Sequence, residues 1–392
     1  MKKRLLFYCQ HILGIGHLIR SMEIVRGLTA SFQVCFINGG EIIQGFQVPA
    51  GVEVVNLPAI KTDSEFHELQ IPEGFDSVEA LLEHRRDILL KVLEQVQPDV
   101  VMVELFPFGR RRFSTELVPL LEEAKVIGAR TICSLRDIVV TKQDQQRHEE
   151  KVCKLMNRHF DMLLIHGDPW FMPLETSFSR VQDLTCEVHY TGYVIQQEER
   201  LAASAKSDAL NLPKPLILTS VGGGRFGHEL LDCVAQASAI LEDQIPHHIQ
   251  MFTGPFCPDA VLERMQAIAQ TRSNLTVDRY TPNLLQYMRQ ADLSISMAGY
   301  NTTMNILSTG TRAMLLPFTG NDDQEQRIRS ERLEELGVVQ VIRSADLNPE
   351  AFAGKVVQAL RRSSKAIAFD LQGVEKTALL IHSLVHDDVR VA

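Results

Sequence analysis

The chain has 392 residues, of which 45% are hydrophobic and 23% charged, the composition of an ordinary globular protein with a sizeable core. This length exceeds what one hydrophobic core usually organises, so we expect two domains. The formal net charge of −9 excludes a general attraction to nucleic acid or to an anionic membrane surface. Any phosphate site must therefore be local.

The seven cysteines are scattered without CxxC or CxH spacing, and several lie in apolar, strand-like runs. We expect reduced thiols in a cytoplasmic protein, without a disulfide framework or a structural zinc site. The apolar run Leu5–Cys9 stops at Gln10 and lacks a small-residue cleavage site, so it predicts a first strand rather than a signal peptide. No stretch is long and apolar enough to predict a transmembrane segment.

Short apolar runs alternate with amphipathic segments through the first half of the chain. We expect strands at Leu5–Cys9, Gln33–Ile37, Val52–Leu57, Val100–Glu104, Arg130–Leu135 and Met162–His166, and helices at Leu18–Thr29, Ser77–Gln97, Ser114–Ile127 and Lys142–Phe160. This alternation predicts a mostly parallel sheet that binds ligands at the carboxyl ends of its strands. The polar segment Lys61–Phe75 predicts a long surface loop.

The segment Gln196–Pro215 is rich in Glu, Ala, Ser and Lys and predicts a linker, which divides the chain into domains 1–195 and 196–392. The pattern then restarts, with strands expected at Leu216–Ser220, His248–Thr253, Leu275–Asp278, Leu293–Ser296, Ala313–Leu316 and Val338–Ile342. A last amphipathic segment, Lys365–Val385, could pack across the first domain. The expected fold class is α/β, with two tandem Rossmann-like, doubly wound domains facing an interdomain cleft.

Two loops of the second half are predicted to face one ligand site. A strand runs into Gly299, and Asn301 or Thr302 can cap the following helix, whose first N–H groups attract an anion. Another strand ends at Pro317, and the loop Asn321–Gln326 opens the next helix. The alternative interpretation is an ordinary strand-to-helix turn.

Three consecutive glycines, Gly222, Gly223 and Gly224, stand where the first strand of the second half meets a helix. They allow the backbone to approach a diphosphate closely, and Arg225 can add a charge-assisted contact. The loop lacks the spacing of a Walker loop or a dinucleotide fingerprint, which disfavours ATP hydrolysis and nicotinamide binding. A flexible turn is the alternative.

The loop after the first strand contains His11, Gly14, Gly16 and His17. His17 could take the proton of an attacking hydroxyl, because the pKa of a histidine lies near neutrality. A packing or capping role is the alternative for this residue.

Charged residues also follow the later strands of the first half. Glu104 is expected near the cleft, and Arg110–Arg112 could hold an anionic acceptor or form a solvated face. Arg136-Asp137 and His166–Pro169 follow the next two strands, where they could line a ligand crevice or form an ion pair or a turn. We expect no metal site at His247-His248, which lacks partners at ligand spacing.

Together these motifs resemble the GT-B glycosyltransferases, specifically the MurG-like branch (family 28) and the bacterial predicted glycosyltransferases beside it. The resemblance is carried by Ala291–Ser296 with Ala298–Thr302, by Asp322–Gln324, by Gly14–His17 and by Thr191–Tyr193. It is strong over residues 275–340 and weaker before residue 200.

The resemblance implies a hexosyltransferase-type enzyme of the EC 2.4 class. Such an enzyme moves a sugar from a nucleoside-diphosphate sugar, with a UDP-sugar as first choice, to a hydroxyl of a small-molecule or lipid-linked acceptor. The transfer is expected to be metal-independent and inverting, with no cofactor besides the nucleotide sugar. Neither nucleic acid nor a transmembrane segment is expected, and peripheral membrane contact is left open.

The resemblance also assigns roles to individual residues. The donor site is expected to comprise Gly222, Gly223, Gly224, Arg225, Tyr280, Thr281, Gly299, Asn301, Thr302, Asn305, Asp322, Gln324 and Glu325. The acceptor site is expected to comprise His11, Gly14, Gly16 and Arg110, with His17, Glu104 and Asp137 as catalytic residues.

Two residues depart from the pattern of the branch. Asn305 stands where the branch usually has a glutamate that binds the ribose hydroxyls, and Met297 stands where a basic residue is common. An amide loses the charge-assisted strength of a carboxylate. Asn305 therefore leaves open a non-catalytic subunit that binds a nucleotide sugar. A nucleotide-sugar hydrolase or 2-epimerase on the same scaffold is a further alternative.

Overall fold

The chain divides into two compact units in the computed structural model. The first unit consists of residues 1–195 and 369–392, and the second of residues 196–368. The structure describes residues 2–12, 16–43, 46–62, 69–140, 143–196, 213–320, 324–362, 365 and 367–386. The predicted linker begins at the division between the units, and its residues 197–212 lie outside the described part.

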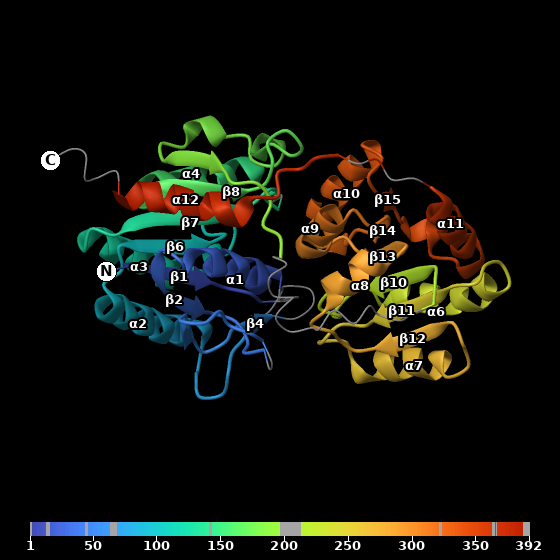
Figure 1. The fold of residues 1–392 in the computed structure, drawn as a ribbon. Coiled ribbons are helices and arrows are strands. Elements are labelled where there is room, and N and C mark those ends of the chain that lie inside the picture. The colour runs from blue at the N-terminus through green and yellow to red at the C-terminus, as the bar shows by residue number, and fades with distance from the viewer. Residues whose placement is uncertain are drawn as a thin grey trace. The chain divides into compact units, whose positions relative to one another are not determined.

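A seven-stranded parallel sheet forms the centre of the first unit (Figure 1). Its strand order is β3-β2-β1-β6-β7-β8-β9, so the chain proceeds outward from β1 first to one edge and then to the other. The strands are β1 (Lys3–Cys9), β2 (Phe32–Asn38), β3 (Glu53–Asn56), β6 (Val100–Glu104), β7 (Arg130–Arg136), β8 (Met162–His166) and β9 (Glu187–Tyr190). This order is that of a doubly wound sheet and confirms the expected fold class for this unit.

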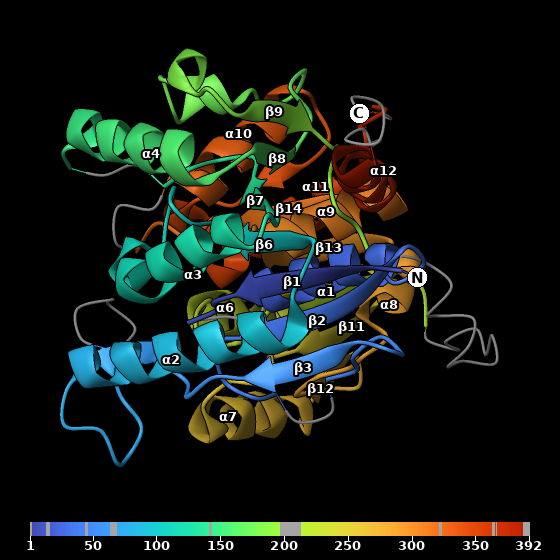
Figure 2. The same cartoon turned by 90° about the vertical axis from the view of Figure 1, so that its left-hand side faces the viewer.

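Helices cover both faces of this sheet, as Figure 2 shows. Leu6 and Tyr8 of β1 pack into a core with α2, α3 and α4, whereas Leu5, Phe7 and Cys9 pack into a second core with α1 and α12. The helices are α1 (Gly16–Leu28), α2 (Val78–Val96), α3 (Ser114–Val126), α4 (Gln145–His159) and α12 (Gly373–His386). Successive residues of a strand point to opposite faces, so a strand buried on both faces is apolar throughout.

The last described helix, α12, packs against α1 of the first unit. It begins at Gly373, later than the amphipathic segment predicted from Lys365. The chain at the start of this helix pairs with the segment that follows β9: Tyr193 N–H donates to the Asp370 carbonyl at 2.7 Å, and Gly373 N–H donates to the Tyr193 carbonyl at 3.1 Å.

The segment predicted as a surface loop contains a short antiparallel pair, β4 (Lys61–Thr62) and β5 (Leu69–Gln70). Residues 63–68 between these strands lie outside the described part of the chain.

The second unit contains a six-stranded parallel sheet in the order β12-β11-β10-β13-β14-β15, the order of a dinucleotide-binding Rossmann sheet. Its strands are β10 (Leu216–Ser220), β11 (His248–Phe252), β12 (Leu275–Asp278), β13 (Leu293–Met297), β14 (Ala313–Leu316) and β15 (Gln340–Val341). Its helices are α6 (His228–Glu242), α7 (Asp259–Ala269), α8 (Leu284–Gln290), α9 (Tyr300–Thr309), α10 (Glu325–Glu335) and α11 (Pro349–Arg361). The expectation of two doubly wound domains is confirmed.

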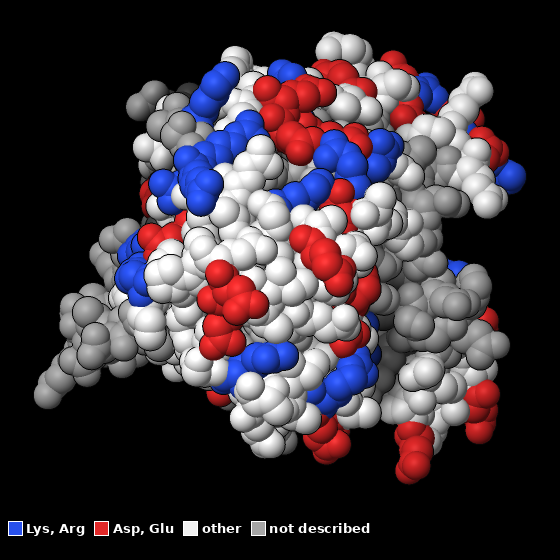
Figure 3. Space-filling view, turned by 90° about the vertical axis from the view of Figure 1, so that its right-hand side faces the viewer, with Lys and Arg blue, Asp and Glu red and all other residues white. Residues whose placement is uncertain are grey.

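The acidic excess of the chain does not form a large one-sign patch on the face drawn in Figure 3, where Lys and Arg are interspersed with Asp and Glu. Among the described residues, no helix has both the length and the apolar character needed to cross a membrane.

Candidate functional site

The predicted donor residues gather at one edge of the second sheet. Gly222, Tyr280 and Gly299 directly follow β10, β12 and β13, three parallel strands of the same sheet. Because parallel strands end at the same edge, their following loops share one side of the unit, where ligands bind in open α/β sheets.

The glycine loop after β10 has a backbone that other residues would strain. Gly222 and Gly224 have φ angles of 63° and 86°, in the left-handed region. A Cβ on Gly222 would meet no described atom within 4 Å, and one on Gly223 would meet only Phe256, at 3.6 Å. The guanidinium of Arg225 lies 4.8 Å from the centre of the Phe256 ring. One side of the loop is therefore open to a ligand.

The next loop along the sheet supports this glycine loop. Gly254 follows β11 with a φ angle of 94°, and a Cβ there would come within 2.5 Å of the Gly224 nitrogen. Phe256 N–H donates to the Gly223 carbonyl at 2.9 Å, which joins the two loops. Gly254 was not predicted as a site residue, although a Gly-Pro pair directly after a predicted strand indicates a special turn.

The start of α9 is also open. Gly299 is its N-cap and has no side chain that could cap the helix. The expectation that Asn301 or Thr302 caps it is wrong, because the helix begins at Tyr300 and both residues lie within its first turn. A Cβ on Gly299 would meet no described atom within 4 Å. The described residues therefore leave space at Gly299, beside the positive end of the α9 helix dipole.

Two predicted donor residues are buried and make contacts within the second unit. Asn305 is 5% exposed, and its Nδ2 donates to Gln196 Oε1 at 3.3 Å. Glu325 is also buried and forms an ion pair with Arg329 at 2.7 Å, and the Arg329 guanidinium lies over the ring of Tyr300. The Arg329 guanidinium thus links α10 to the start of α9, and Glu325 pairs with it from within α10.

The other predicted donor residues are nearer the surface. Tyr280 is 58% exposed. The hydroxyl of Thr281 accepts a hydrogen bond from the backbone of Asn283 at 3.1 Å, and Gln324 Oε1 accepts one from Arg327 Nε at 2.6 Å. Asp322 lies outside the described residues.

In the first unit, the structure brings His17 and Glu104 together. His17 lies in the first turn of α1 and Glu104 ends β6, and His17 Nδ1 is 2.7 Å from Glu104 Oε1. Arg20 Nη2 donates to the same oxygen. The carboxylate is fully buried and Arg20 is 2% exposed. Arg20 was missed, although residues three apart lie on one helix face and His17 was already a candidate.

Burial and charge set the protonation states of this group. Burial lowers the pKa of His17 to about 4; Glu104 opposes that shift, and the positive charges of Arg136 and Arg110 add to it. Burial alone would raise the pKa of the Glu104 carboxyl, but His17 and Arg20 outweigh it and the pKa falls to about 2. Near neutral pH, therefore, an ionised Glu104 faces a neutral imidazole.

The remaining first-unit candidates contact other partners. His11 is 4% exposed, and its Nε2 lies 3.1 Å from Asn38 Oδ1. Arg110 has a left-handed φ angle of 58°, and its Nε donates to the Gln10 carbonyl at 3.1 Å. Backbone strain of this kind concentrates at functional sites.

Three further candidates complete the set. Asp137 is fully buried and accepts a hydrogen bond from the Tyr193 hydroxyl at 3.3 Å. Gly16 is the first residue of α1, and Gly14 lies outside the described residues. The described part of the chain contains no group of three or more His, Cys, Asp or Glu side chains that could hold a metal ion.

Comparison with known proteins gives a family match for part of the chain. Residues 218–381 match the glycosyltransferase family 28 C-terminal domain. A similar curated protein is the UDP-N-acetylglucosamine–N-acetylmuramyl-(pentapeptide) pyrophosphoryl-undecaprenol N-acetylglucosamine transferase of Thermosipho africanus, which is 26% identical over 40% of this chain and 42% of that protein. The protein of the same name from Bordetella pertussis is 26% identical over 45% and 51%. The chain thus spans about half the length of the curated relatives it matches.

Solved structures share the fold over nearly the whole chain. Phytolacca americana UGT2, solved with UDP-2fluoro-glucose and pterostilbene, has a TM-score of 0.60 at 16% identity over 97% of this chain and 94% of that one. MurG of Acinetobacter baumannii has a TM-score of 0.57 at 14% identity over 98% and 100%. The resemblance drawn from the sequence is confirmed: the chain has the GT-B fold of these proteins, and its residues 218–381 match the glycosyltransferase family 28 C-terminal domain.

Proposed function

We propose that this protein is a glycosyltransferase that moves a sugar from a nucleoside-diphosphate sugar to a hydroxyl of a small-molecule or lipid-linked acceptor. One observation carries the proposal: the family 28 domain contains, at one sheet edge, an open glycine loop at Gly222–Gly224 and an open helix start at Gly299. Backbone N–H groups and the positive end of a helix together suit a diphosphate.

In this proposal the second unit holds the donor. The diphosphate contacts the loop at Gly222–Gly224 and the first turn of α9, with Arg225 beside it. The exposed ring of Tyr280 is available to contact the nucleobase of the donor. Gln324 and Asp322 contact the sugar hydroxyls. A UDP-sugar is the first choice of donor.

The first unit holds the acceptor and the general base, His17. Glu104 is ionised and can only accept a hydrogen bond, so the His17 proton resides on Nδ1 and leaves Nε2 as the basic nitrogen. Glu104 thereby orients the imidazole and stabilises the imidazolium that forms when His17 takes a proton. His11, Gly16 and Arg110 are proposed to contact the acceptor.

The transfer is a single displacement with inversion. The acceptor oxygen forms a bond to the anomeric carbon while the bond from that carbon to the diphosphate oxygen breaks. The acceptor proton moves to His17 Nε2, and the nucleoside diphosphate leaves with the bonding electrons. The N–H groups of the glycine loop and of α9 stabilise the charge that develops on the leaving diphosphate, so no metal ion is required.

A ligand screen tests donor binding first. We expect UDP or another nucleoside diphosphate to raise the melting temperature of the second unit, since a ligand that binds only the folded state stabilises it. Nucleosides without phosphates should have little effect. If no nucleoside diphosphate binds at millimolar concentration, the donor assignment is refuted.

Turnover is then measured with the nucleotide sugar that binds best. His17→Gln should reduce release of the nucleoside diphosphate about 10²- to 10⁴-fold, the usual contribution of a general base, without changing nucleotide affinity. His189→Gln is the matched control, since His189 is a partly exposed residue of the same unit that contacts Glu187.

The same assay separates the alternatives. Free sugar released in the absence of acceptor identifies a hydrolase, and a changed epimer with an intact nucleotide identifies a 2-epimerase. Binding without turnover in any acceptor extract identifies a non-catalytic subunit. The contact between Asn305 and Gln196 motivates this last alternative. Asn305 stands where the branch has a ribose-binding glutamate, and its amide already donates a hydrogen bond to Gln196.

A further inference from the structure

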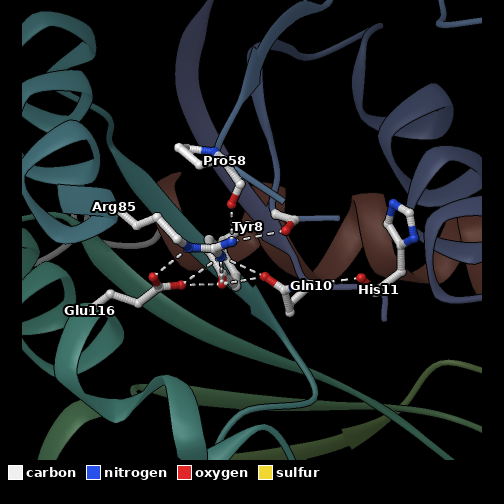
Figure 4. Close-up of polar contacts among 7 residues, drawn as sticks. Tyr8, Gln10, His11, Pro58, Arg85 and Glu116 are labelled. Carbon is white, nitrogen blue, oxygen red and sulfur yellow. Dashed lines mark hydrogen bonds and ion pairs between the residues drawn. The ribbon is translucent and has the colours of Figure 1, made fainter. Parts of the chain in front are cut away.

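A fully buried arginine, Arg85 of α2, lies at the centre of a polar network in the first unit (Figure 4). Its Nε donates to Glu116 Oε2 at 2.7 Å, and its Nη2 donates to Glu116 Oε1 at 2.9 Å. Nη2 also donates to the Tyr8 hydroxyl at 3.1 Å and to Gln10 Oε1 at 2.5 Å. Glu116 has no exposed surface either, so a complete ion pair is buried.

The same guanidinium joins three loops. Nη1 donates to the backbone carbonyls of Gly39 at 3.0 Å and Pro58 at 2.8 Å, while Nη2 contacts Gln10. Gln10, Gly39 and Pro58 belong to the segments that follow β1, β2 and β3, three adjacent strands of one parallel sheet. These segments lie at the edge of the sheet where ligands bind in doubly wound folds.

Gln10 extends the network toward the candidate acceptor residues. Its Nε2 donates to the His11 carbonyl at 3.1 Å, and its own carbonyl accepts the hydrogen bond from Arg110 Nε at 3.1 Å. A Cβ on Gly39 would collide with Gln10 Oε1 and come within 3.0 Å of Arg85 Nη2. The hydrogen bond between Arg85 and Gln10 therefore requires a residue without a side chain at position 39.

A buried ion pair is a poor source of stability, because desolvation offsets the attraction between its charges. The planar fork of an arginine can, however, fix several acceptors in one geometry, which a lysine cannot do. We propose that Arg85 is a positioning residue of the acceptor site: it fixes the segments after β1, β2 and β3, and through Gln10 it fixes His11 and Arg110. This inference rests on the proposed function for the identity of the site.

The test uses two variants of the full chain and one matched control. Arg85→Lys keeps a positive charge beside Glu116 but removes the fork. Gly39→Ala changes no charge and displaces Gln10 from the other side of the network. Arg86→Lys is the control, because Arg86 is the next residue of α2, is partly exposed and forms an ion pair with its neighbour Asp87.

Amide hydrogen exchange reports whether the segments are fixed. Gly39 N–H donates to the Cys9 carbonyl and Leu57 N–H to the Asn38 carbonyl, both at 2.9 Å, so both amides are protected in the folded chain. Both variants should raise exchange at these two amides at least tenfold. Exchange should stay unchanged at Asp161, whose N–H donates to the Thr131 carbonyl between other strands. Arg86→Lys should alter none of them.

Turnover reports whether the fixed geometry matters for the reaction. With the nucleotide sugar identified above, kcat should fall at least tenfold in both variants, because a displacement of about 1 Å is costly in a positioned site. The nucleotide Kd, which depends on the second unit, should stay within twofold of the wild type. If Arg85 has only a structural role, the variants should instead lower the folded fraction and raise amide exchange equally at Asp161.

The inference is overturned if amide exchange at positions 39 and 57 stays at the wild-type rate, or if it rises equally at Asp161. It is also overturned if exchange rises at both amides while kcat is unchanged. Failure of the proposed function looks different: the wild-type chain then turns over no nucleotide sugar. That result refutes the role of Arg85 in positioning an acceptor site. The exchange data still decide whether Arg85 fixes the three segments.

Discussion

Removing the carboxylate of Glu104 should strongly destabilise the first unit. Glu104 is fully buried and accepts hydrogen bonds from His17 and Arg20, and Arg20 is itself only 2% exposed. Glu104→Ala leaves the Arg20 charge buried without this partner, which costs about 3–5 kcal/mol. In a unit of about 200 residues each kcal/mol lowers the melting temperature by roughly 2–4 °C, so we expect a fall of about 6–20 °C.

The chain offers a selective probe for this measurement. Its single tryptophan, Trp170, lies in the first unit, so tryptophan fluorescence during urea unfolding reports that unit alone. Glu122→Ala is the matched control, because Glu122 pairs with Arg158 at 2.9 Å on the surface, where a pair contributes about 1 kcal/mol or less. Equal unfolding free energies for the two variants, within 1 kcal/mol, would refute the reasoning.

Three further outcomes are expected. Because the folded-state pKa of His17 lies at about 4, below the value near 6.5 in an unfolded chain, the unfolded state binds the extra proton between these values. Stability should fall with decreasing pH across this window by about 1.4 kcal/mol per unit more in the wild type than in His17→Asn, as measured by urea unfolding. Gly254→Ala should weaken nucleotide binding, measured by calorimetry, because the added Cβ would collide with the neighbouring glycine loop. Gly310→Ala is the control and should leave the affinity unchanged, because Gly310 has a φ angle of 68° and a Cβ there would meet no described atom within 4 Å. Arg225→Ala should weaken nucleotide binding about 10- to 100-fold in the same assay, as expected for loss of a charged hydrogen bond, whereas Arg264→Ala, which removes a surface pair with Asp232, should have no effect.

The layout of both sheets could be predicted from local patterns. Short apolar runs such as Leu216–Ser220 alternate with amphipathic helices, and that alternation admits few arrangements besides a parallel, doubly wound sheet. The same alternation marks the strand ends, so the sequence predicts that Glu104 and Gly299 lie at ligand-binding edges. The prediction that Asn301 or Thr302 caps α9 was wrong because a boundary shift of one or two residues decides which residue is the N-cap.

The contacts that define the candidate sites could not be read from the sequence. His17 and Arg20 meet Glu104 from 87 and 84 positions away, and Arg85 reaches Gly39 across 46 residues. Whether such side chains meet depends on strand order, register and helix placement, which local propensities do not encode.

The fold class, the two parallel sheets and the loops with special backbone requirements are predictable from local patterns, because periodicity and glycine spacing are local properties. The contacts of Glu104 with His17, of Gln196 with Asn305 and of one arginine with three strand ends depend on how the elements pack. These are properties of residues far apart in the chain, and only the packed sheets bring them within hydrogen-bonding distance.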